Sequence, residues 1–295
     1  MPELPEVETV RAGLEPVLRG RRFVRVEQRR ENLRFPLPER FAERLTGRKV
    51  FKLDRRAKYI LIHLDSAEVL AVHLGMTGRF TVSRRGKHEA LQLGEFTHEH
   101  GHYDKHDHLV FTMSGGAVVT YNDARRFGYM TLIPESEIAQ DAYFRGLGVE
   151  PLSDELDPAY VARRARDRKS DLKAFLMDQR IVAGLGNIYV CEALFRARLD
   201  PWKLAGRLAT PGGKPTPAAE RLVPAIKSVL QDAIRAGGST LRDYKQANGE
   251  LGTFQHAFQV YGREGQPCAR PGCRGTVRRK TQGGRSTFYC PACQR

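Results

Sequence analysis

The chain has 295 residues, and 49 Lys and Arg against 34 Asp and Glu give it a net charge of +15. A positive charge of this size favours a polyanionic partner, either a nucleic acid or an anionic membrane surface. No apolar run approaches the ~20 residues that a membrane span needs, so the sequence favours nucleic acid.

The first predicted element is an amphipathic helix over residues 5–19, where Val and Leu recur at helical spacing. Pro5 suits its first turn and Gly20 its end, whereas Pro16 is expected to kink the last turn. The N-terminal MPELPEVETV is acidic and interrupted by proline, so we expect no signal peptide.

Short β-type runs follow over residues 21–133, and they predict an antiparallel sandwich or barrel with the leading helix as its only helix. The predicted strands are 23–26, 49–53, 60–64, 69–74, 109–113, 118–121 and 129–133.

The helical period returns from about residue 154, after a stretch punctuated by Pro and Gly. The clearest predicted helices are 171–179, 187–198 and 218–236. The fold class is therefore α+β, with a β domain, an α domain and a small metal module. The predicted boundaries are 1–133 for the β domain, 134–153 for a linker, 154–258 for the helical domain and 259–295 for the metal module.

Four cysteines in the last 28 residues have the spacing C-x4-C-x16-C-x2-C, namely Cys268, Cys273, Cys290 and Cys293. Two close pairs joined by a hairpin are typical of a tetrahedral Zn²⁺ site, and Gly283–Gly284 is a plausible turn for that hairpin. The alternatives are two disulfides or four unrelated thiols, which the absence of a secretory signal disfavours. Cys191 lies among apolar residues of a predicted helix and is expected to be a core thiol.

Four segments in this order resemble the formamidopyrimidine-DNA glycosylase family: PELPEVETV, HLGMTGRF (73–80), NDARRFG (122–128) and QRIVAGLGNIYVCEALF (179–195). The resemblance covers essentially the whole chain. It implies an N-terminal β-sandwich, and a helical domain with a helix–two-turn–helix element and a zinc finger. DNA is expected to lie between the two domains.

The residues at the N-terminus suit the chemistry of such an enzyme. Once Met1 is removed, Pro2 would carry a free secondary amine that can attack an anomeric carbon and form an iminium. An α-amine titrates near ~8, so more of it is neutral at physiological pH than of a lysine side chain. Glu3 is placed to transfer protons, and Glu6 is a candidate second carboxylate. The alternative is that P-E-L-P-E is only a helix-entry segment.

Two basic residues match catalytic positions of the family. Lys58, in DRRAKY, matches a lysine that contacts phosphate near the lesion and assists the chemistry. Arg285, in GGRSTFYC, matches a finger arginine that assists the second elimination. The alternatives are an ordinary basic loop and a solvated hairpin charge.

Extrusion of a base from a duplex leaves a gap that the protein must fill. Met76, Arg125 and Phe127 match the family's intercalating trio, in which apolar wedges unstack bases and arginine pairs with the estranged base. His73 is expected to shape the same loop or to reach a phosphate. A core role for Met76 is the alternative.

Two further DNA contacts are predicted. Asn187 begins a helix after the glycine loop AGLGN, where backbone amides can bind a phosphate. His106, in KHDH, matches a family histidine that touches DNA. The six histidines within residues 88–108 could form a second metal site, although exposed loop histidines are the simpler interpretation. The resemblance places the segment 241–252 over the flipped base.

The resemblance implies a bifunctional DNA glycosylase and AP lyase that removes oxidised purines from damaged double-stranded DNA. It implies one structural Zn²⁺ per chain, a monomer without a membrane partner, and a bacterial cytoplasmic, nucleoid-associated location. Two alternatives are an endonuclease VIII-like enzyme for oxidised pyrimidines and a non-catalytic zinc-ribbon DNA-binding protein. Leu4 and the Met76, Arg125 and Phe127 set favour the purine enzyme over the first, and the Pro2–Glu3 start argues against the second.

Overall fold

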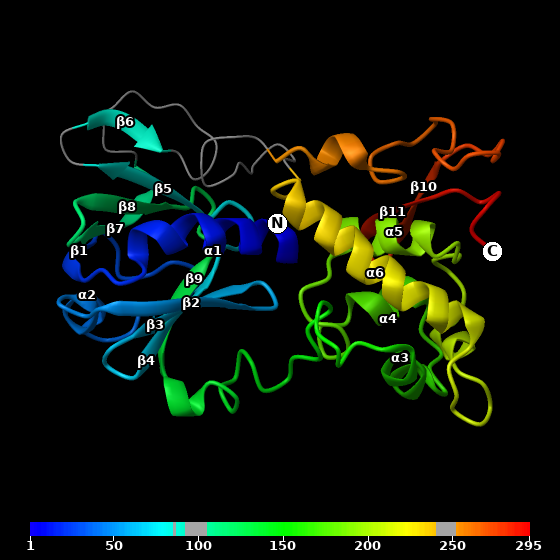
Figure 1. Cartoon of the computed structure of the whole chain (residues 1–295), viewed down its shortest axis with the longest axis horizontal. Coiled ribbons are helices and arrows are strands. Elements are labelled where there is room, and N and C mark those ends of the chain that lie inside the picture. The colour runs from blue at the N-terminus through cyan, green and yellow to red at the C-terminus, as the bar shows by residue number, and fades with distance from the viewer. Residues whose placement is uncertain (85–86, 92–104, 240–251) are drawn as a thin grey trace. The chain divides into compact units, whose positions relative to one another are not determined.

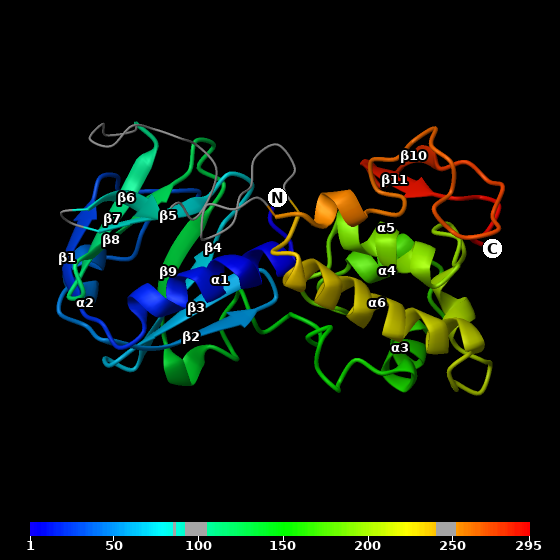
Figure 2. The same ribbon diagram turned by 45° about the horizontal axis from the view of Figure 1, so that its top comes forward.

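The computed structural model describes residues 1–84, 87–91, 105–239 and 252–295, and the side chains of residues 84–91 are not described. The chain forms two compact units (Figures 1 and 2). Unit 1 comprises Met1–Arg145 and Ile234–Gln255, and unit 2 comprises Gly146–Ala233 and His256–Arg295. The overall class is α+β, as predicted.

Unit 1 is an antiparallel β-sandwich. Its five-stranded sheet has the order β1-β7-β8-β5-β6, and its four-stranded sheet has the order β2-β3-β4-β9. The strands are β1 (Phe23–Gln28), β2 (Val50–Arg56), β3 (Tyr59–Leu64), β4 (Glu68–His73), β5 (Arg79–Arg84), β6 (Lys87–Leu91), β7 (Asp107–Met113), β8 (Ala117–Asn122) and β9 (Tyr129–Pro134).

One apolar core joins both sheets to the first helix, α1 (Leu4–Leu18), which runs beside β2 and β3 (Figures 1 and 2). The residues of α1 that recur at helical spacing, Val7, Val10 and Leu14, are at most 1% exposed. Burial of such side chains stabilises by ~1.5–3 kcal/mol each, which fixes the helix against the sandwich. Because α1 is held in this way, the residues that precede it are also held.

The expectation of only one helix in the β domain is wrong. A second helix, α2 (Phe41–Leu45), spans a single turn. Its two buried residues, Phe41 and Leu45, are four apart and therefore lie on one face of the helix. A pair of this kind is too short a pattern to separate a helix from a loop in the sequence.

Unit 2 is helical and carries a β-hairpin. Its helices are α3 (Pro158–Ala165), α4 (Leu172–Met177), α5 (Asn187–Arg196) and most of α6 (Pro217–Arg235), with a 3-10 helix η2 (Ala205–Leu208). The hairpin pairs β10 (Arg278–Gln282) with β11 (Arg285–Tyr289), as predicted. Gly283 and Gly284 form its turn with φ of 57° and 74°, values that glycine adopts without the cost paid by other residues.

The connection between α4 and α5 is organised by Gln179. Its side-chain amide donates to the Leu185 carbonyl at 2.8 Å, and its carbonyl accepts from the Gly184 amide at 2.8 Å. These two bonds close the glycine loop and direct the chain into α5. The result is the helix–two-turn–helix element that the resemblance implies. Two other short 3-10 helices, η1 (Glu135–Glu137) and η3 (Phe254–Ala257), lie outside it.

Candidate functional site

The N-terminal segment is buried although it begins the chain. Met1 is 51% exposed, whereas Pro2 is buried and Glu3 is only 4% exposed. Glu3 is the N-cap of α1, and its amide donates to Oε2 of Glu6 at 2.9 Å. Pro2 and Glu3 therefore lie at the positive end of a helix dipole, in a fixed backbone conformation.

Glu6 also binds a segment more than 230 residues further along the chain. Its Oε1 accepts from the backbone amide of Ser239 at 2.8 Å and from the Ser239 hydroxyl at 3.0 Å. Gly238 has φ +80°, and a Cβ there would lie 3.1 Å from the Glu6 side chain. Glu6 thus joins the Glu3 backbone to the residues that precede segment 240–251, which lies outside the described residues.

Lys58 lies in the turn between β2 and β3 and is only 8% exposed. The turn has Ala57 at φ +52°, and the Ala57 carbonyl accepts from Arg55 at 3.0 Å. The alternative of an ordinary solvated loop charge does not fit this burial. The positive charge of Lys58 lies close enough to His73 to lower the pKa of that histidine.

His73 ends β4 inside a group of aromatic rings. Its ring stacks on Tyr129 with centroids 5.1 Å apart and planes 13° apart, and it contacts Tyr59 at 5.0 Å. Burial first, and then the charges of Lys58 and Arg34, lower the pKa of His73 to about 4. The Gly75 amide donates to Nδ1 at 3.0 Å. Because Nδ1 accepts, the neutral ring carries its proton on Nε2, where it is a donor.

The segments HLGMTGRF and NDARRFG meet at one end of the sandwich. The Arg125 amide donates to the Thr77 hydroxyl at 3.2 Å, and that hydroxyl donates to Asp123. Asp123 also accepts from the Gly128 amide at 2.8 Å. These bonds bring together the two loops that carry the three residues predicted to intercalate, Met76, Arg125 and Phe127.

Two of those three side chains are exposed. Phe127 is 40% exposed, and the Arg125 guanidinium lies 4.7 Å from the centre of its ring. Met76 is half-buried. An exposed phenylalanine beside an arginine is unusual for a packing role and suits contact with bases.

The KHDH segment lies against the same loop. The Asp123 amide donates to the His106 carbonyl at 3.1 Å, and the Asp123 carbonyl is 2.8 Å from Nε2 of His108. Burial lowers the pKa of His108. The histidine cluster, for which a second metal site is the less favoured alternative, falls mostly outside the described residues, which exclude His98, His100 and His102.

Unit 2 brings Asn187 and the β11 strand together. The side-chain amide of Asn187 donates from Nδ2 to the Ser286 carbonyl at 2.9 Å, next to Arg285. Lys173, on α4, is 3% exposed and donates to the Thr287 hydroxyl at 2.6 Å. Burial lowers the pKa of Lys173, and the charge of Arg285 lowers it further. A pocket of about 480 Å³ lies between α4 and the hairpin turn, and Arg285 lines it.

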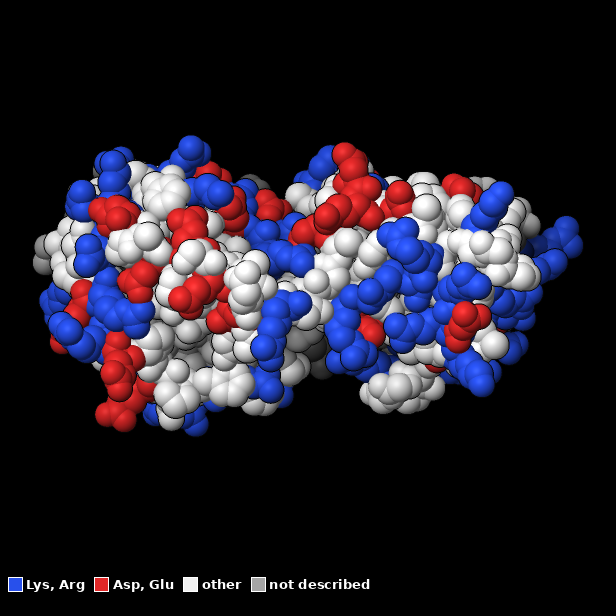
Figure 3. Space-filling model, turned by 90° about the horizontal axis from the view of Figure 1, so that it is seen from below, with Lys and Arg blue, Asp and Glu red and all other residues white. Residues whose placement is uncertain are grey.

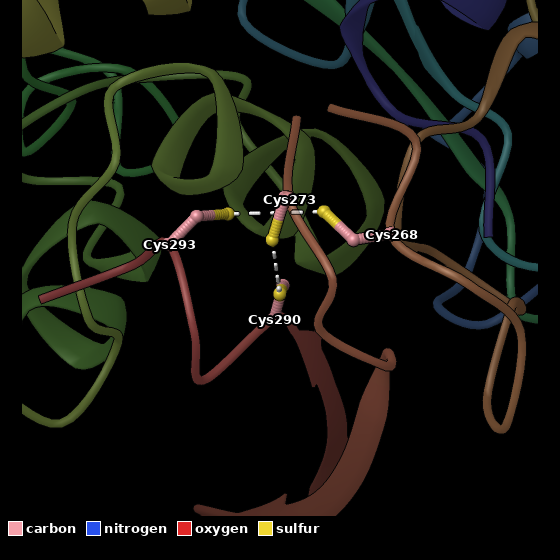
Figure 4. A group of neighbouring side chains, drawn as sticks. All are labelled: Cys268, Cys273, Cys290 and Cys293. Atoms are coloured by element: carbon pink, nitrogen blue, oxygen red, sulfur yellow. Dashed lines mark hydrogen bonds between the residues drawn. The ribbon is translucent and has the colours of Figure 1, made fainter. Parts of the chain in front are cut away.

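The four cysteines of the tail converge on one point (Figure 4). The Sγ atoms of Cys268 and Cys293 are 3.8 Å apart, and those of Cys273 and Cys290 are 3.7 Å apart. A tetrahedron with Zn–S bonds of ~2.3 Å requires sulfurs ~3.8 Å apart. The donor set therefore fits one structural Zn²⁺, as predicted, and a thiol cluster at this spacing is not two disulfides.

Gly275 makes room for this cluster. A Cβ at Gly275 would lie 2.7 Å from Sγ of Cys290 and 2.6 Å from Cβ of Ala292. Cys191 is fully buried in the neighbouring apolar cluster, in accord with its expected role as a core thiol.

Many lysines and arginines gather on the face of unit 2 that Figure 3 shows. Residues 163–169, at the end of α3 and just after it, hold five basic residues and one acidic residue. Among the described residues, no helix is long and apolar enough to cross a bilayer.

Comparisons with known proteins match every part of this architecture. The formamidopyrimidine-DNA glycosylase N-terminal domain matches residues 1–130, and the H2TH domain of that enzyme matches 147–245. A zinc finger found in FPG and IleRS matches residues 265–295.

Full-length relatives and solved structures agree. The formamidopyrimidine-DNA glycosylase of Methylobacterium radiotolerans is 58% identical over 100% of this chain and 99% of its own length. The crystal structure of MutM (Fpg) from Thermus thermophilus has a TM-score of 0.81 at 38% identity, covering 99% of this chain and 98% of that one. The Lactococcus lactis Fpg, solved in complex with an abasic-site-containing DNA, has a TM-score of 0.83 at 31% identity, covering 100% of both chains.

The sandwich, the helix–two-turn–helix element and the four-cysteine finger thus define a zinc-containing DNA glycosylase of base excision repair, which binds DNA. The chain belongs to the formamidopyrimidine-DNA glycosylase family.

Several partners of the site residues have no signal in the sequence. The contact of Glu6 with Ser239 and that of Lys173 with Thr287 join residues more than 110 positions apart. A signal did exist for Lys173, because a lysine among Leu172, Phe175 and Leu176 interrupts an apolar helix face. Glu192 likewise places a charged residue on an apolar helix. It is fully buried, and its carboxylate accepts hydrogen bonds from the backbone amides of residues 259–261.

Proposed function

We propose that the protein is a bifunctional glycosylase and AP lyase that removes oxidised purines, 8-oxoguanine and formamidopyrimidines, from damaged duplex DNA. It would then cleave the strand by β/δ-elimination. The observation that carries the proposal is the buried Pro2–Glu3 start at the positive end of α1. Two L. lactis Fpg complexes, one of a mutant with Fapy-dG-containing DNA and one with abasic-site DNA, support the same lesion class and the lyase step.

Pro2 is the proposed nucleophile. After removal of Met1, its nitrogen lone pair attacks C1′ of the damaged nucleotide, and the base leaves with the electrons of the glycosidic bond. Opening of the sugar then gives a cationic iminium on the proline nitrogen. The nearby positive end of α1 disfavours the protonated amine and so keeps more of it reactive.

Three other residues are assigned to proton transfer and phosphate contact. Glu3 is buried and directly follows Pro2 in the sequence. It supplies and removes protons during base release and ring opening. Lys58 contacts a phosphate near the lesion and assists the chemistry. Arg285 assists the second elimination from its exposed place at the start of β11.

The remaining predicted residues are assigned to DNA binding. Met76, Arg125 and Phe127 fill the gap left by the extruded nucleotide, and their shared location at one end of the sandwich supports this. His73, with an Nε2 donor, and His106 contact the DNA from unit 1. Asn187 contacts a phosphate from the N-terminus of α5.

A paired substrate assay tests the lesion class. Duplexes with 8-oxoguanine opposite C and with thymine glycol opposite A are incubated with the protein, and free base and strand breaks are measured separately. We expect release of 8-oxoguanine at least about tenfold faster, a difference of ~1.4 kcal/mol in activation free energy. Faster release of thymine glycol would show that the enzyme acts on oxidised pyrimidines, and base release without strand breaks would show that it has no lyase activity.

We expect the active species to be a monomer.

A further inference from the structure

A second pocket lies beside the exposed Arg125 and Phe127, in unit 1. Its volume is about 410 Å³, and its walls are Leu33, Arg34, Arg125, Arg126 and Phe127. Three of the five wall residues are arginines. Arg34 belongs to a loop that none of the functional motifs includes.

The loop that carries Arg34 is fixed in place by its backbone. The Arg34 amide donates to the Gly128 carbonyl at 3.0 Å, which ties it to the residue after Phe127. The Leu33 amide donates to the Phe35 carbonyl at 3.0 Å, and the Leu33 side chain is buried. Phe35 packs edge-on against Tyr129 at 5.3 Å. The Arg34 side chain is exposed, and its guanidinium lies 5.4 Å from the centre of the Phe35 ring.

Arg126, in the wall of the same pocket as Arg34, has an uncommon backbone conformation. Its φ is +54°, in the left-handed region, which costs a non-glycine residue on the order of 1 kcal/mol. Such conformations persist where the surroundings impose them, and they are frequent at binding sites.

Among the described residues, the three guanidiniums have no carboxylate partner. Of the residues that the structure describes, none places a carboxylate within 4.0 Å of Arg34, Arg125 or Arg126. Other arginines of unit 1 do have a carboxylate partner: Arg22 pairs with Asp65 at 3.0 Å, and Arg40 pairs with Glu43 at 2.6 Å. Like charges that surround one pocket without acids are stabilised by an anion, and arginine forks match the two free oxygens of a phosphodiester.

We propose that this pocket binds one backbone phosphodiester of the DNA strand opposite the lesion, with Arg34 and Arg126 as its ligands. The inference rests on the proposed function, in which Arg125 faces the estranged base of that strand. A phosphate held next to Arg125 then belongs to the same strand. Leu33 and Phe127 provide the apolar wall that a deoxyribose contacts.

The salt dependence of binding tests the proposal with a duplex that holds a tetrahydrofuran abasic analogue. Arg34→Ala should lower the slope of log K against log salt by about 0.9, the value for one phosphate contact. It should weaken binding about tenfold at moderate salt, in line with loss of one charge-assisted hydrogen bond. Arg34→Lys should retain most of the slope, since the charge remains. Arg25→Ala is the matched control, because Arg25 is an exposed arginine of unit 1 that already faces Glu27 at 3.5 Å.

Neutral methylphosphonates, placed one at a time along each strand, then locate the phosphate. We expect one position on the strand opposite the lesion to weaken the wild type but not Arg34→Ala. An unchanged salt slope for Arg34→Ala would refute phosphate binding in this pocket. If only methylphosphonates on the lesion strand weakened binding, the assignment to the opposite strand would be wrong. Borohydride trapping of the wild type on an 8-oxoguanine duplex is measured in parallel. Failure of the proposed function appears there as no adduct, whereas failure of this inference leaves the adduct in place.

Discussion

His73 shows how the sandwich controls the state of a single side chain. Burial, and then the charges of Lys58 and Arg34, favour neutral imidazole, while the Gly75 amide selects the tautomer. A neutral Nε2–H donor can bind a phosphate without a change of charge across physiological pH. The sequence placed His73 at this loop but gave no sign of the surrounding rings, because Tyr59, Tyr129 and Tyr143 come from distant segments.

The depressed pKa of His73 predicts a pH-dependent stability. The unfolded state takes up the proton below pH ~6.5 while the folded state resists it until about 4. Stability is therefore fully present above pH 6.5 and is lost as the pH falls through the window from 6.5 to 4. We expect a loss of about 1–2 kcal/mol between pH 7.5 and pH 5 that His73→Gln lacks. Hydrogen exchange in β3, β4 and β9 measures it, and equal losses in both proteins would contradict it.

Most strands and the long helices follow from the sequence. Strands such as β3 and β4 are short, nearly continuous apolar runs, and the buried residues of the helices recur at helical spacing. The strands β5 and β6 and the helices α2 and α3 go beyond the predicted elements. In β5, Phe80 and Val82 do alternate inward, but the run is short and rich in polar residues. In α3, six of the eight residues are Pro, Ala or Arg, and the buried face consists of Val161 and two alanines, so it is small.

The loop of Gly75 approaches the loop of Phe127 so closely that a side chain at Gly75 would disturb both loops. Gly75 has φ +63°, and a Cβ there would lie 2.2 Å from the backbone carbon of Phe127. Gly75→Ala should therefore displace the loop that carries Phe127 and weaken lesion binding at least about tenfold, beyond the ~1 kcal/mol strain of the left-handed conformation. Gly116→Ala is the matched control, because φ is +79° and nothing lies within 4 Å. Equal binding by the two variants would show that the close approach is unimportant.

The finger depends on its metal because β10 has no buried residue and the buried apolar side chains of residues 265–295 besides the cysteines, Val277, Phe288 and Tyr289, are few. We expect one zinc per chain by elemental analysis, and none in Cys290→Ser. That variant should lose DNA binding while β2–β4 keep their hydrogen-exchange protection, since the sandwich has its own core. Cys191→Ala, which changes a thiol outside the cluster, should retain the zinc. Full lesion binding by the zinc-free protein would show that the zinc-loaded finger is not needed for DNA binding.

At the scale of the whole molecule, the sequence motifs identified the family and the residue types of the site, and the structure added their supports. Motifs such as PELPEV and NDARRFG are local and can be recognised within a few residues. Supports such as the Glu6–Ser239 contact need the folded chain, because no spacing rule connects residues so far apart. The +15 charge predicted a nucleic-acid partner, but only the folded structure shows where the basic residues gather.

Borohydride trapping with a site-mapped adduct tests the central claim, that Pro2 is the nucleophile, most directly. Reduction during turnover on an 8-oxoguanine·C duplex should fix the iminium, and mass spectrometry should place the DNA on the N-terminal peptide without Met1. A variant with Gly inserted between Met1 and Pro2 should bind the lesion but form no adduct, because its proline nitrogen is an amide. Glu3→Gln should bind and release base more slowly. An adduct on Lys58, or base release with no adduct, would contradict the account.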